Sequence, residues 1–589
     1  MGTGRKSDLK GLSMSSRNQS VAGAIAWPVV VFGLSCIVFT MTTWLIALPP
    51  AWATFEFCQY AEIARNLAQD GTFDTRLVEP MALAYLDANQ FGSLSLSESQ
   101  RWPVVNRYPL PCFVIAALFR GFGQSNEVAA WSNGLAIGGL AALATLLARH
   151  WYGPGWGAIA ALLILANPAF YGYFILLGTP DIWFALIFAL ELLAFVRLWA
   201  EPDREKILAP IVGLLAGLAF LTRFNVTLFL LPQVAILLTR RRLRAASLLV
   251  AFSAIVAAPM LLYNLRHFGR PGVSVYSTWN LLDDMGAYRV EPWLYYKVPE
   301  TGPEIWSHLA GFIGKFVRNL TRVVPVRIWS LWHFDVVLPL GLLALMIRLS
   351  KWGRRQEESG GVERAFLLWS AALFALQLVV FSAMRLELED RGSPHHGRYF
   401  FWFAVPVLLL TLGGLKRLTL RHRAFHGLTA LVILVQLVLF GLTWKGWIEQ
   451  NRGGTNVGRD PIRKMLSQLV PDDRVIVSNQ PQWTAWYCKK RSVSLPADPD
   501  ELARMNRTSP TPAAYLLIDL NANFINLDPR WATLVVPAED GPSEWETSVL
   551  IDFEYVLPVA QTRPIHYVLL RRRDVPPSRL EQTWREGRN

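Results

Sequence analysis

Residues 207–244 have the sequence ILAPIVGLLAGLAFLTRFNVTLFLLPQVAILLTRRRLR. Two apolar stretches, Ile207–Thr222 and Val226–Thr239, flank a short connection that carries Arg223, and four arginines lie between residues 240 and 244. Apolar helices joined by Lys/Arg-rich loops are typical of membrane spans, and the basic loops stay on the cytoplasmic side. The segment therefore predicts two spans with Arg223 on the opposite, outer side, although Val226–Thr239 is also short enough to be re-entrant.

The same alternation of apolar stretches and basic loops runs along most of the 589-residue chain. A mean hydropathy of +0.29 and 24 Trp are typical of a membrane protein, in which Trp gathers at the interfaces. The net charge of +13 lies mostly in short loops, where it sets orientation, so it does not indicate a nucleic-acid partner. We predict about eleven spans, several of them shorter than the usual ~20 residues. Besides the two above they are Val21–Leu48, Val128–Ala148, Trp156–Gly178, Ile182–Val196, Ala245–Leu262, Val336–Ile347, Ala365–Met384, Tyr399–Leu415 and Leu428–Trp444.

The order of the spans predicts the topology. The first apolar stretch is longer than the roughly 7–15 residues of a signal-peptide core, so we expect an anchor behind a cytoplasmic tail, residues 1–20. An odd number of spans then places the C-terminus outside. The predicted fold class is a polytopic α-helical membrane protein with a C-terminal extracytoplasmic α/β domain. Its parts are a membrane domain at 21–450 with outer loops at 49–125 and 264–333, and an α/β domain at 451–589 with strands near 474–478, 514–520 and 566–570.

The two outer loops contain amphipathic patterns. Apolar residues recur at helical spacing over residues 57–67 and again over residues 305–320. Such patterns predict helices that lie in the plane of the membrane interface. Cys58 and Cys112 both fall in the first of these loops, on the oxidising side, so a disulfide between them is an open alternative to two free thiols.

Ionisable residues at the ends of the predicted spans gather on the outer face. A transporter tends to place such residues at the bilayer midplane, whereas an enzyme of one membrane surface needs them at helix ends facing one compartment. Each also has a structural explanation, because a carboxylate at a helix start complements the helix dipole and an arginine at headgroup level can snorkel. These residues are Glu56, Asp181, Arg223, Arg266, His395 and Arg398.

Two further acidic features have different interpretations. Glu191 lies inside the fourth span, where a charge is costly and indicates function by default, whether protonated or paired. Asp498-Pro499-Asp500 has the Asp-x-Asp spacing of metal-bound nucleotide-sugar sites, but an N-cap followed by proline in the first helical turn explains the same residues. The sequence therefore predicts no resident metal and requires no cofactor, with a divalent cation as an open alternative.

Several short motifs follow one another in a fixed order. They are Glu56 before Tyr60-Ala61-Glu62-Ile63-Ala64, then Tyr108-Pro109-Leu110-Pro111, Asp181, Gly217-Leu218 to Phe224-Asn225, Asn264-Leu265-Arg266 to Arg270-Pro271, and Arg398-Tyr399. In order and spacing they resemble the GT-C superfamily of membrane glycosyltransferases. The similarity is greatest to the bacterial relatives of protein O-mannosyltransferases and of the lipid A aminoarabinose transferase, and it covers residues 20–450.

The resemblance implies an inverting glycosyltransferase in the cytoplasmic (inner) membrane. Its donor would be a polyprenyl-phosphate-linked sugar, and its acceptor an extracytoplasmic glycan, lipid or protein. The family often has Asp at the base position, with a second carboxylate alongside, where this chain has Glu56 between Phe55 and Phe57. The implied roles are catalysis for Glu56 and Asp181, donor-phosphate binding for Arg223, Arg266 and Arg398, and substrate binding for Tyr60, Glu62, Tyr108, His395, His396 and Tyr399.

Three other functions fit parts of the pattern. A ligase or polymerase that transfers whole lipid-linked oligosaccharides often needs a His-Arg pair, which His395, His396 and Arg398 can supply. A lipid-linked sugar flippase would place charges at the midplane and have related halves, whereas only Glu191 lies there and no repeat is seen. A scaffold whose outer domain binds cell-wall glycan is the third alternative.

Overall fold

The computed structural model of the chain describes most of the membrane part and the core of the C-terminal region. It gives no account of the remaining residues, which include the first twenty and the last twelve. The described residues are 21–45, 55–89, 101–105, 107–171, 181–272, 275–323, 361–384, 397–420, 424–451, 466–510, 512–519, 545–556 and 562–577, with short stretches at 334–343 and 528–531 and the single residue 463.

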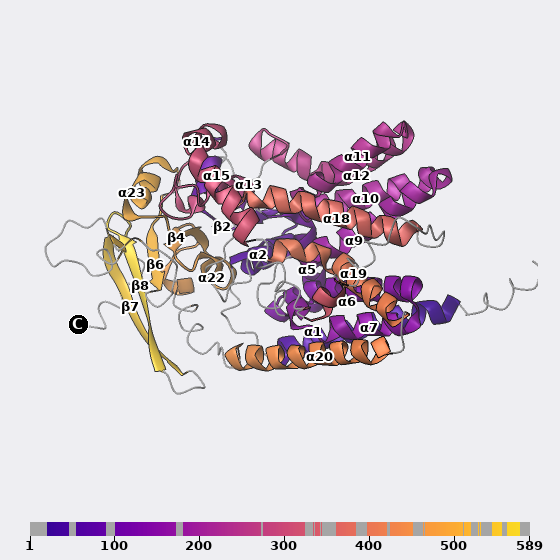
Figure 1. Cartoon of the computed structure of the whole chain (residues 1–589). Helices are drawn as coiled ribbons and strands as arrows, with labels where there is room; N and C mark the ends of the chain where they lie inside the picture. The colour runs from indigo at the N-terminus through magenta and orange to yellow at the C-terminus, as the bar shows by residue number, and fades with distance from the viewer. Residues whose placement is uncertain are drawn as a thin grey trace, which may run out of the picture.

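The membrane part is a bundle of long apolar helices (Figure 1). Within the described ranges, seven helices are long and apolar enough to cross a membrane, and three shorter apolar helices accompany them. Nine predicted spans coincide with helices, which confirms a polytopic α-helical membrane protein, while Trp156–Gly178 and Val336–Ile347 are only partly described. The helices are α1 (Val21–Leu45), α5 (Pro109–Phe122), α6 (Asn126–Tyr152), α7 (Pro154–Leu165), α9 (Asp181–Ala200), α10 (Glu205–Phe220), η3 (Phe224–Val226), α11 (Thr227–Thr239), α12 (Leu243–Phe268), α18 (Gly361–Ser382), η8 (Gly397–Phe403), α19 (Ala404–Thr419) and α20 (Ala424–Asn451).

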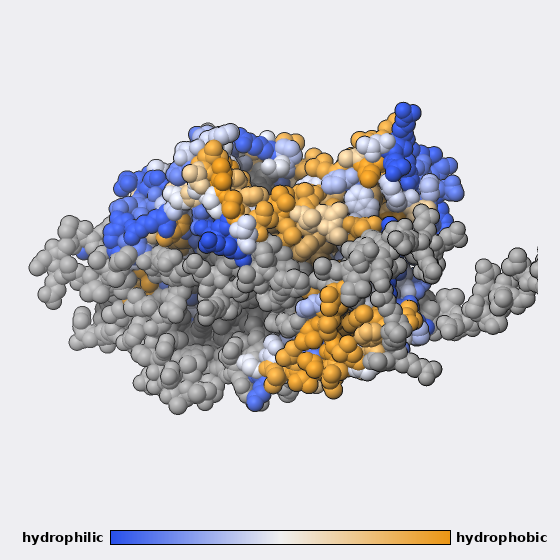
Figure 2. All heavy atoms as spheres, in the orientation of Figure 1, coloured by the Kyte–Doolittle hydropathy of each residue, from blue (hydrophilic) through white to orange (hydrophobic). Residues whose placement is uncertain are grey.

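Apolar side chains cover much of the outside of the bundle. On α20 the exposed residues Leu431, Leu434, Val438 and Leu442 recur every three or four positions and so share one helix face. Figure 2 shows apolar residues along α20 and over α18. A soluble protein rarely exposes so large an apolar surface, but in a bilayer it is the side that faces lipid.

Two glycines in residues 207–244 allow α10 to pack closely against α12. A Cβ added to Gly213 would lie 2.4 Å from the carbonyl oxygen of Leu249, and one added to Gly217 would lie 2.5 Å from Cβ of Val256. Small residues four apart let two membrane helices approach until their backbones touch. The apolar stretch at 207–222 is therefore held against α12 by backbone contact.

The two amphipathic patterns of the outer loops form helices with different surroundings. α15 (Leu309–Arg318) keeps Leu309, Ile313 and Val317 exposed, as an interfacial helix would. α2 (Phe55–Gln69) is instead buried at every position from 57 to 67, against α5 and a C-terminal helix, so the expected interfacial position is wrong for it. The other elements of these loops are β1 (Asp74–Thr75), β2 (Leu77–Val78), α3 (Pro80–Ala88), β3 (Trp102–Pro103), α13 (Val275–Leu282), η4 (Pro292–Leu294), α14 (Thr301–Ser307) and η5 (Asn319–Val323).

The C-terminal region is built on a six-stranded sheet with the order β2-β5-β4-β6-β8-β7. β2 comes from the first outer loop and pairs in parallel with β5, Leu77 opposite Ser492. The predicted strands are present as β4, β6 and β8, but the sheet is completed by a strand from far outside residues 451–589. The C-terminal elements are β4 (Val475–Ser478), α22 (Pro481–Trp486), β5 (Arg491–Ser494), α23 (Pro499–Thr508), β6 (Tyr515–Asp519), β7 (Trp545–Val556) and β8 (Thr562–Arg572).

Candidate active site

Two of the predicted site residues, Asp181 and Arg223, form a buried ion pair. Asp181 begins α9, and Arg223 lies in the connection between α10 and η3. The Nη2 atom of Arg223 lies 2.6 Å from Oδ1 of Asp181, and the side chains are only 8% and 0% exposed. α11 runs from this connection to the arginine cluster at 240–244, so the pair lies at the opposite end of α11 from that cluster.

Aromatic side chains surround the pair. The Arg223 guanidinium carbon lies 5.9 Å from the ring centroid of Tyr108 and 5.8 Å from that of Trp402. The indole Nε1 of Trp402 donates to Asp181 Oδ1 at 3.3 Å. Cations bind over aromatic faces, and a low-dielectric wall strengthens any charge interaction inside it. The pair is therefore a compact, desolvated site in which an anionic group would interact strongly with Arg223.

Local backbone structure fixes where this site lies. Tyr108 is the N-cap of α5, followed by Pro109 at the first helical position. The amide N–H of Leu110 donates to the carbonyl of Leu221 at 3.1 Å, which ties the start of α5 to the Arg223 connection. Trp402 belongs to η8, the short helix that also contains the backbone of Arg398 and Tyr399. Five of the predicted site residues thus come from elements that meet at one place.

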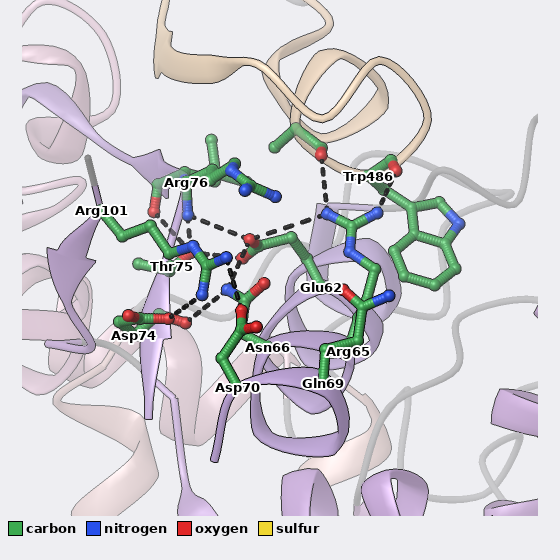
Figure 3. Close-up of polar contacts among 12 residues, drawn as sticks. Glu62, Arg65, Asn66, Gln69, Asp70, Asp74, Thr75, Arg76, Arg101 and Trp486 are labelled. Atoms are coloured by element: carbon green, nitrogen blue, oxygen red, sulfur yellow. Dashed lines mark hydrogen bonds and ion pairs between the residues drawn. The ribbon is translucent and has the colours of Figure 1, made fainter. Parts of the chain in front are cut away.

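A second buried polar cluster surrounds Glu62 on α2 (Figure 3). Its Oε1 accepts from Nδ2 of Asn66 at 2.8 Å and from the backbone N–H of Arg76 at 3.1 Å, and its Oε2 accepts from the Thr75 hydroxyl at 2.8 Å. Burial raises the pKa of the Glu62 carboxyl, against the opposing effects of the Arg65 charge and of these hydrogen bonds. Because Thr75 ends β1 and Arg76 lies between β1 and β2, these two donors let Glu62 fix α2 to both strands.

Arg65 continues this cluster toward the C-terminal region. Its guanidinium donates to the carbonyl oxygens of Trp486 at 2.6 Å and Ala485 at 3.2 Å, and it lies 4.8 Å from the Trp486 ring centroid. Burial lowers the pKa of Arg65 to about 10. The nearest approach of Arg65 to Glu62 is longer, 3.9 Å.

The remaining predicted residues differ in how far the structure places them. Glu56 lies in the first turn of α2, but its side chain, like those of Arg398 and Tyr399, is outside the described part, as are His395 and His396 entirely. Arg266 is exposed in the last turn of α12, where a cation complements the helix dipole, and so it lies outside the buried pair.

The structure adds Arg107 to the candidate residues. Its guanidinium carbon lies 5.6 Å from the ring centroid of Tyr60, both side chains are buried, and the next residue, Tyr108, lines the Asp181–Arg223 pair. Arg107 therefore connects α2 to the segment that lines the Asp181–Arg223 pair. The signal that could have found it is its place directly before the Tyr-Pro-x-Pro motif, at the entry to a helix.

The intramembrane Glu191 has an identified partner. Gln233 of α11 donates from Nε2 to Glu191 Oε2 at 3.2 Å, and both side chains are buried. Like the Asp181–Arg223 pair, this contact connects α9 to the segment around α11. It lies about ten residues further along α9 than Asp181, deeper in the bundle.

The structure also describes two features that the sequence left open. Asp498 is the N-cap of α23, with its Oδ1 accepting from the Glu501 N–H at 2.9 Å, and the described residues contain no group of three or more side chains suited to hold a metal. Cys58 and Cys112 are both buried, and no disulfide joins them.

Known proteins resemble this chain at two levels. A family model described as dolichyl-phosphate-mannose-protein mannosyltransferase matches residues 106–263, the segment that holds Tyr108, Asp181 and Arg223. The crystal structure of ArnT from Cupriavidus metallidurans bound to undecaprenyl phosphate has a TM-score of 0.55 at 14% identity, covering 93% of this chain and 98% of that chain. The apo state of the same ArnT gives a TM-score of 0.41 at 16% identity over the same shares. No curated protein matches the sequence. The resemblance seen in the motifs is thus confirmed, and the chain has an ArnT-like fold.

Proposed function

We propose that the protein is an inverting glycosyltransferase that moves a monosaccharide from a polyprenyl-phosphate carrier to an extracytoplasmic acceptor. The observation that carries the proposal is the buried Asp181–Arg223 pair, lined by Tyr108 and Trp402, inside the segment matched by the mannosyltransferase model. A planar guanidinium held by a carboxylate and aromatic rings is well suited to a phosphate, whose oxygens match its fork of donors.

The proposed reaction is a single displacement at the anomeric carbon. The acceptor hydroxyl oxygen forms the new bond while the bond from that carbon to the phosphate oxygen breaks, and polyprenyl phosphate leaves with the electron pair. Glu56 takes the proton of the hydroxyl as attack proceeds. Arg223 and Arg398 stabilise the leaving phosphate, with Arg266 a further candidate from the surface. The displacement needs no oxidant or reductant, and a divalent cation at the leaving phosphate is an open alternative.

The other assignments follow from the same proposal. The protein would reside in the cytoplasmic (inner) membrane with its site and C-terminal region on the outer face, in contact with membrane lipid. Tyr60, Tyr108, Tyr399, His395 and His396 would line the donor or acceptor. The acceptor would be a cell-envelope glycan, a lipid or a protein, and the C-terminal region would assist its binding. A second carboxylate, Asp181, would act by holding Arg223.

The experiment is a donor-consumption assay with purified protein and synthetic polyprenyl-phosphate sugars. Release of polyprenyl phosphate is the expected result. Glu56→Gln keeps the shape of the base but removes its basicity, and it should lower turnover by about 10²–10⁴-fold while donor binding persists. Glu127→Gln is the matched control, because Glu127 is an exposed carboxylate in the first turn of α6. Transport of the donor across vesicles without release would contradict the proposal.

A further inference from the structure

The side chain of Arg65 on α2 caps the C-terminal end of α22 and so connects the two helices. The last carbonyl groups of a helix lack partners within the helix. Arg65 supplies donors to two of them in α22, the carbonyl oxygens of Ala485 and Trp486. A cation there also complements the negative end of the helix dipole. Figure 3 shows the guanidinium between Glu62 on its own helix and the end of α22.

The end of α22 is also fixed from the membrane side. The Trp486 ring stacks on Phe119 of α5 at 6.0 Å, and its Nε1 donates to Oδ1 of Asn126, which begins α6, at 2.9 Å. Asn126 in turn donates from Nδ2 to the Tyr487 hydroxyl at 2.9 Å. Trp486 and Tyr487 therefore lie among α2, α5 and α6, and Arg65 is bonded to a structure that cannot easily move.

The six-stranded sheet of the C-terminal region contacts α2 at a second point, Glu62. Glu62 accepts from Thr75 and from the Arg76 N–H, and the next residues form β2, which pairs with β5. β5 pairs with β4, and the chain leaving β4 forms α22, which returns to Arg65. The contacts thus form a closed ring through α2, β2, β5, β4 and α22. Removing the Arg65 link would therefore weaken the attachment of α2 to the sheet at one of these two points.

We propose that Arg65 is a positioning residue, which couples the C-terminal sheet to α2 and thereby fixes where Glu56 lies. Glu56 is nine residues before Arg65 on the same helix, about 14 Å along its axis. Helices move as rigid elements, and a displacement of about 1 Å at a reacting group can lower a rate on the order of 10²-fold. The proposal rests on the proposed function, because it takes Glu56 to be the base.

The test compares three variants of the full-length protein. Arg65→Gln loses the charge and one of the two carbonyl contacts, Arg65→Lys keeps a cation that reaches one carbonyl, and Arg101→Gln is the control. Arg101 belongs to the same polar region but contacts Asp70 and Asp74 rather than α22. We expect Arg65→Gln to lower kcat about 10- to 100-fold with little change in the donor KM. Arg65→Lys should recover most of the loss, and Arg101→Gln should keep near-parental turnover.

Hydrogen exchange separates this inference from the proposed function. Amides of α2 and α22 should exchange faster in Arg65→Gln than in the parent, while those of α12 should not change. Unchanged exchange would overturn the coupling, and faster exchange with parental kcat would overturn the positioning role. Equal losses in Arg101→Gln would also overturn it. If the parent consumes no polyprenyl-phosphate sugar, the proposed function fails, and the exchange measurement still decides whether Arg65 links the two helices.

Discussion

Asp181 and Glu62 are both buried carboxylates beside an arginine, yet their surroundings differ. Asp181 contacts Arg223 directly at 2.6 Å, within walls made by Trp402 and Tyr108. Glu62 lies 3.9 Å from Arg65, accepts instead from neutral donors, and leaves Arg65 to bond two backbone carbonyls. Asp181 and Arg223 are thus in direct contact. Glu62 and Arg65 are further apart, and each has close hydrogen bonds to other groups.

This difference separates a cluster suited to bind a ligand from a cluster that stabilises the fold. A buried charge is costly unless it is paired or hydrogen-bonded, so two charges in direct contact inside a desolvated site are sensitive to a third charge such as a phosphate. A carboxylate already bonded by amide and hydroxyl groups responds less, because its partners are parts of a fixed framework. We therefore assign chemistry to the Asp181 pair and rigidity to the Glu62 cluster.

The largest expected effect is the loss of Asp181. Asp181→Asn leaves the Arg223 charge buried without its carboxylate, and breaking a buried pair in this way typically costs about 3–5 kcal/mol. We also expect turnover to fall strongly. A double-mutant cycle with Arg223→Gln, measured by unfolding in detergent, should give a coupling of about 2 kcal/mol, against less than about 0.5 kcal/mol for Glu62→Gln with Arg65→Gln. Equal couplings in the two cycles would remove the distinction drawn above.

Glu62→Gln is expected to have the next largest effect, and on stability rather than on donor affinity. The substituted amide carries two donors where Glu62 carries only acceptors, so at least one of Asn66, Thr75 and Arg76 loses its partner. An unsatisfied buried donor costs about 1–3 kcal/mol. The measurement is the free energy of unfolding together with the donor KM. A weakened donor KM at parental stability would move Glu62 into the substrate site, as the family resemblance implies.

These pairs also show what the sequence can and cannot predict. Apolar stretches and basic loops predicted nine of the described membrane helices, and helix-end positions singled out both Asp181 and Arg223. The sequence did not predict which residue each of them contacts. Apolar periodicity indicates which face of a helix is buried, but not which helix packs against that face. α2 and α15 have the same apolar spacing, but α2 is covered by a helix whose carbonyls bond Arg65 from 421 residues away. A two-residue strand such as β2 has no periodicity to detect.

Glu191 is a buried acid whose described hydrogen bond is to an amide, Gln233, and not to an arginine. Its hydrogen bond with Gln233 is expected to be worth about 1 kcal/mol, as for other polar pairs between membrane helices. Glu191→Gln keeps a hydrogen bond to Gln233 and should be near-parental, whereas Glu191→Leu leaves Gln233 buried without it. Thermal inactivation of the two variants in detergent checks this. If Glu191→Gln abolishes turnover at parental stability, the charge itself acts in function and the contact with Gln233 is not its main role.

The smallest effect is expected at a third acid–arginine contact. It tests whether the burial of an ion pair, and not only its contact distance, determines its contribution to the free energy of unfolding. Arg101 contacts Asp70 at 2.7 Å, nearly as close as Arg223 to Asp181, but the Asp70 side chain is 45% exposed. Exposed ion pairs are screened by water and salt and contribute about 0–1 kcal/mol. Asp70→Asn should therefore lower the free energy of unfolding by less than about 1 kcal/mol, and less still at high salt. A loss as large as that of Asp181→Asn would show that contact distance decides these energies, and the contrast between the two buried clusters would then need another cause.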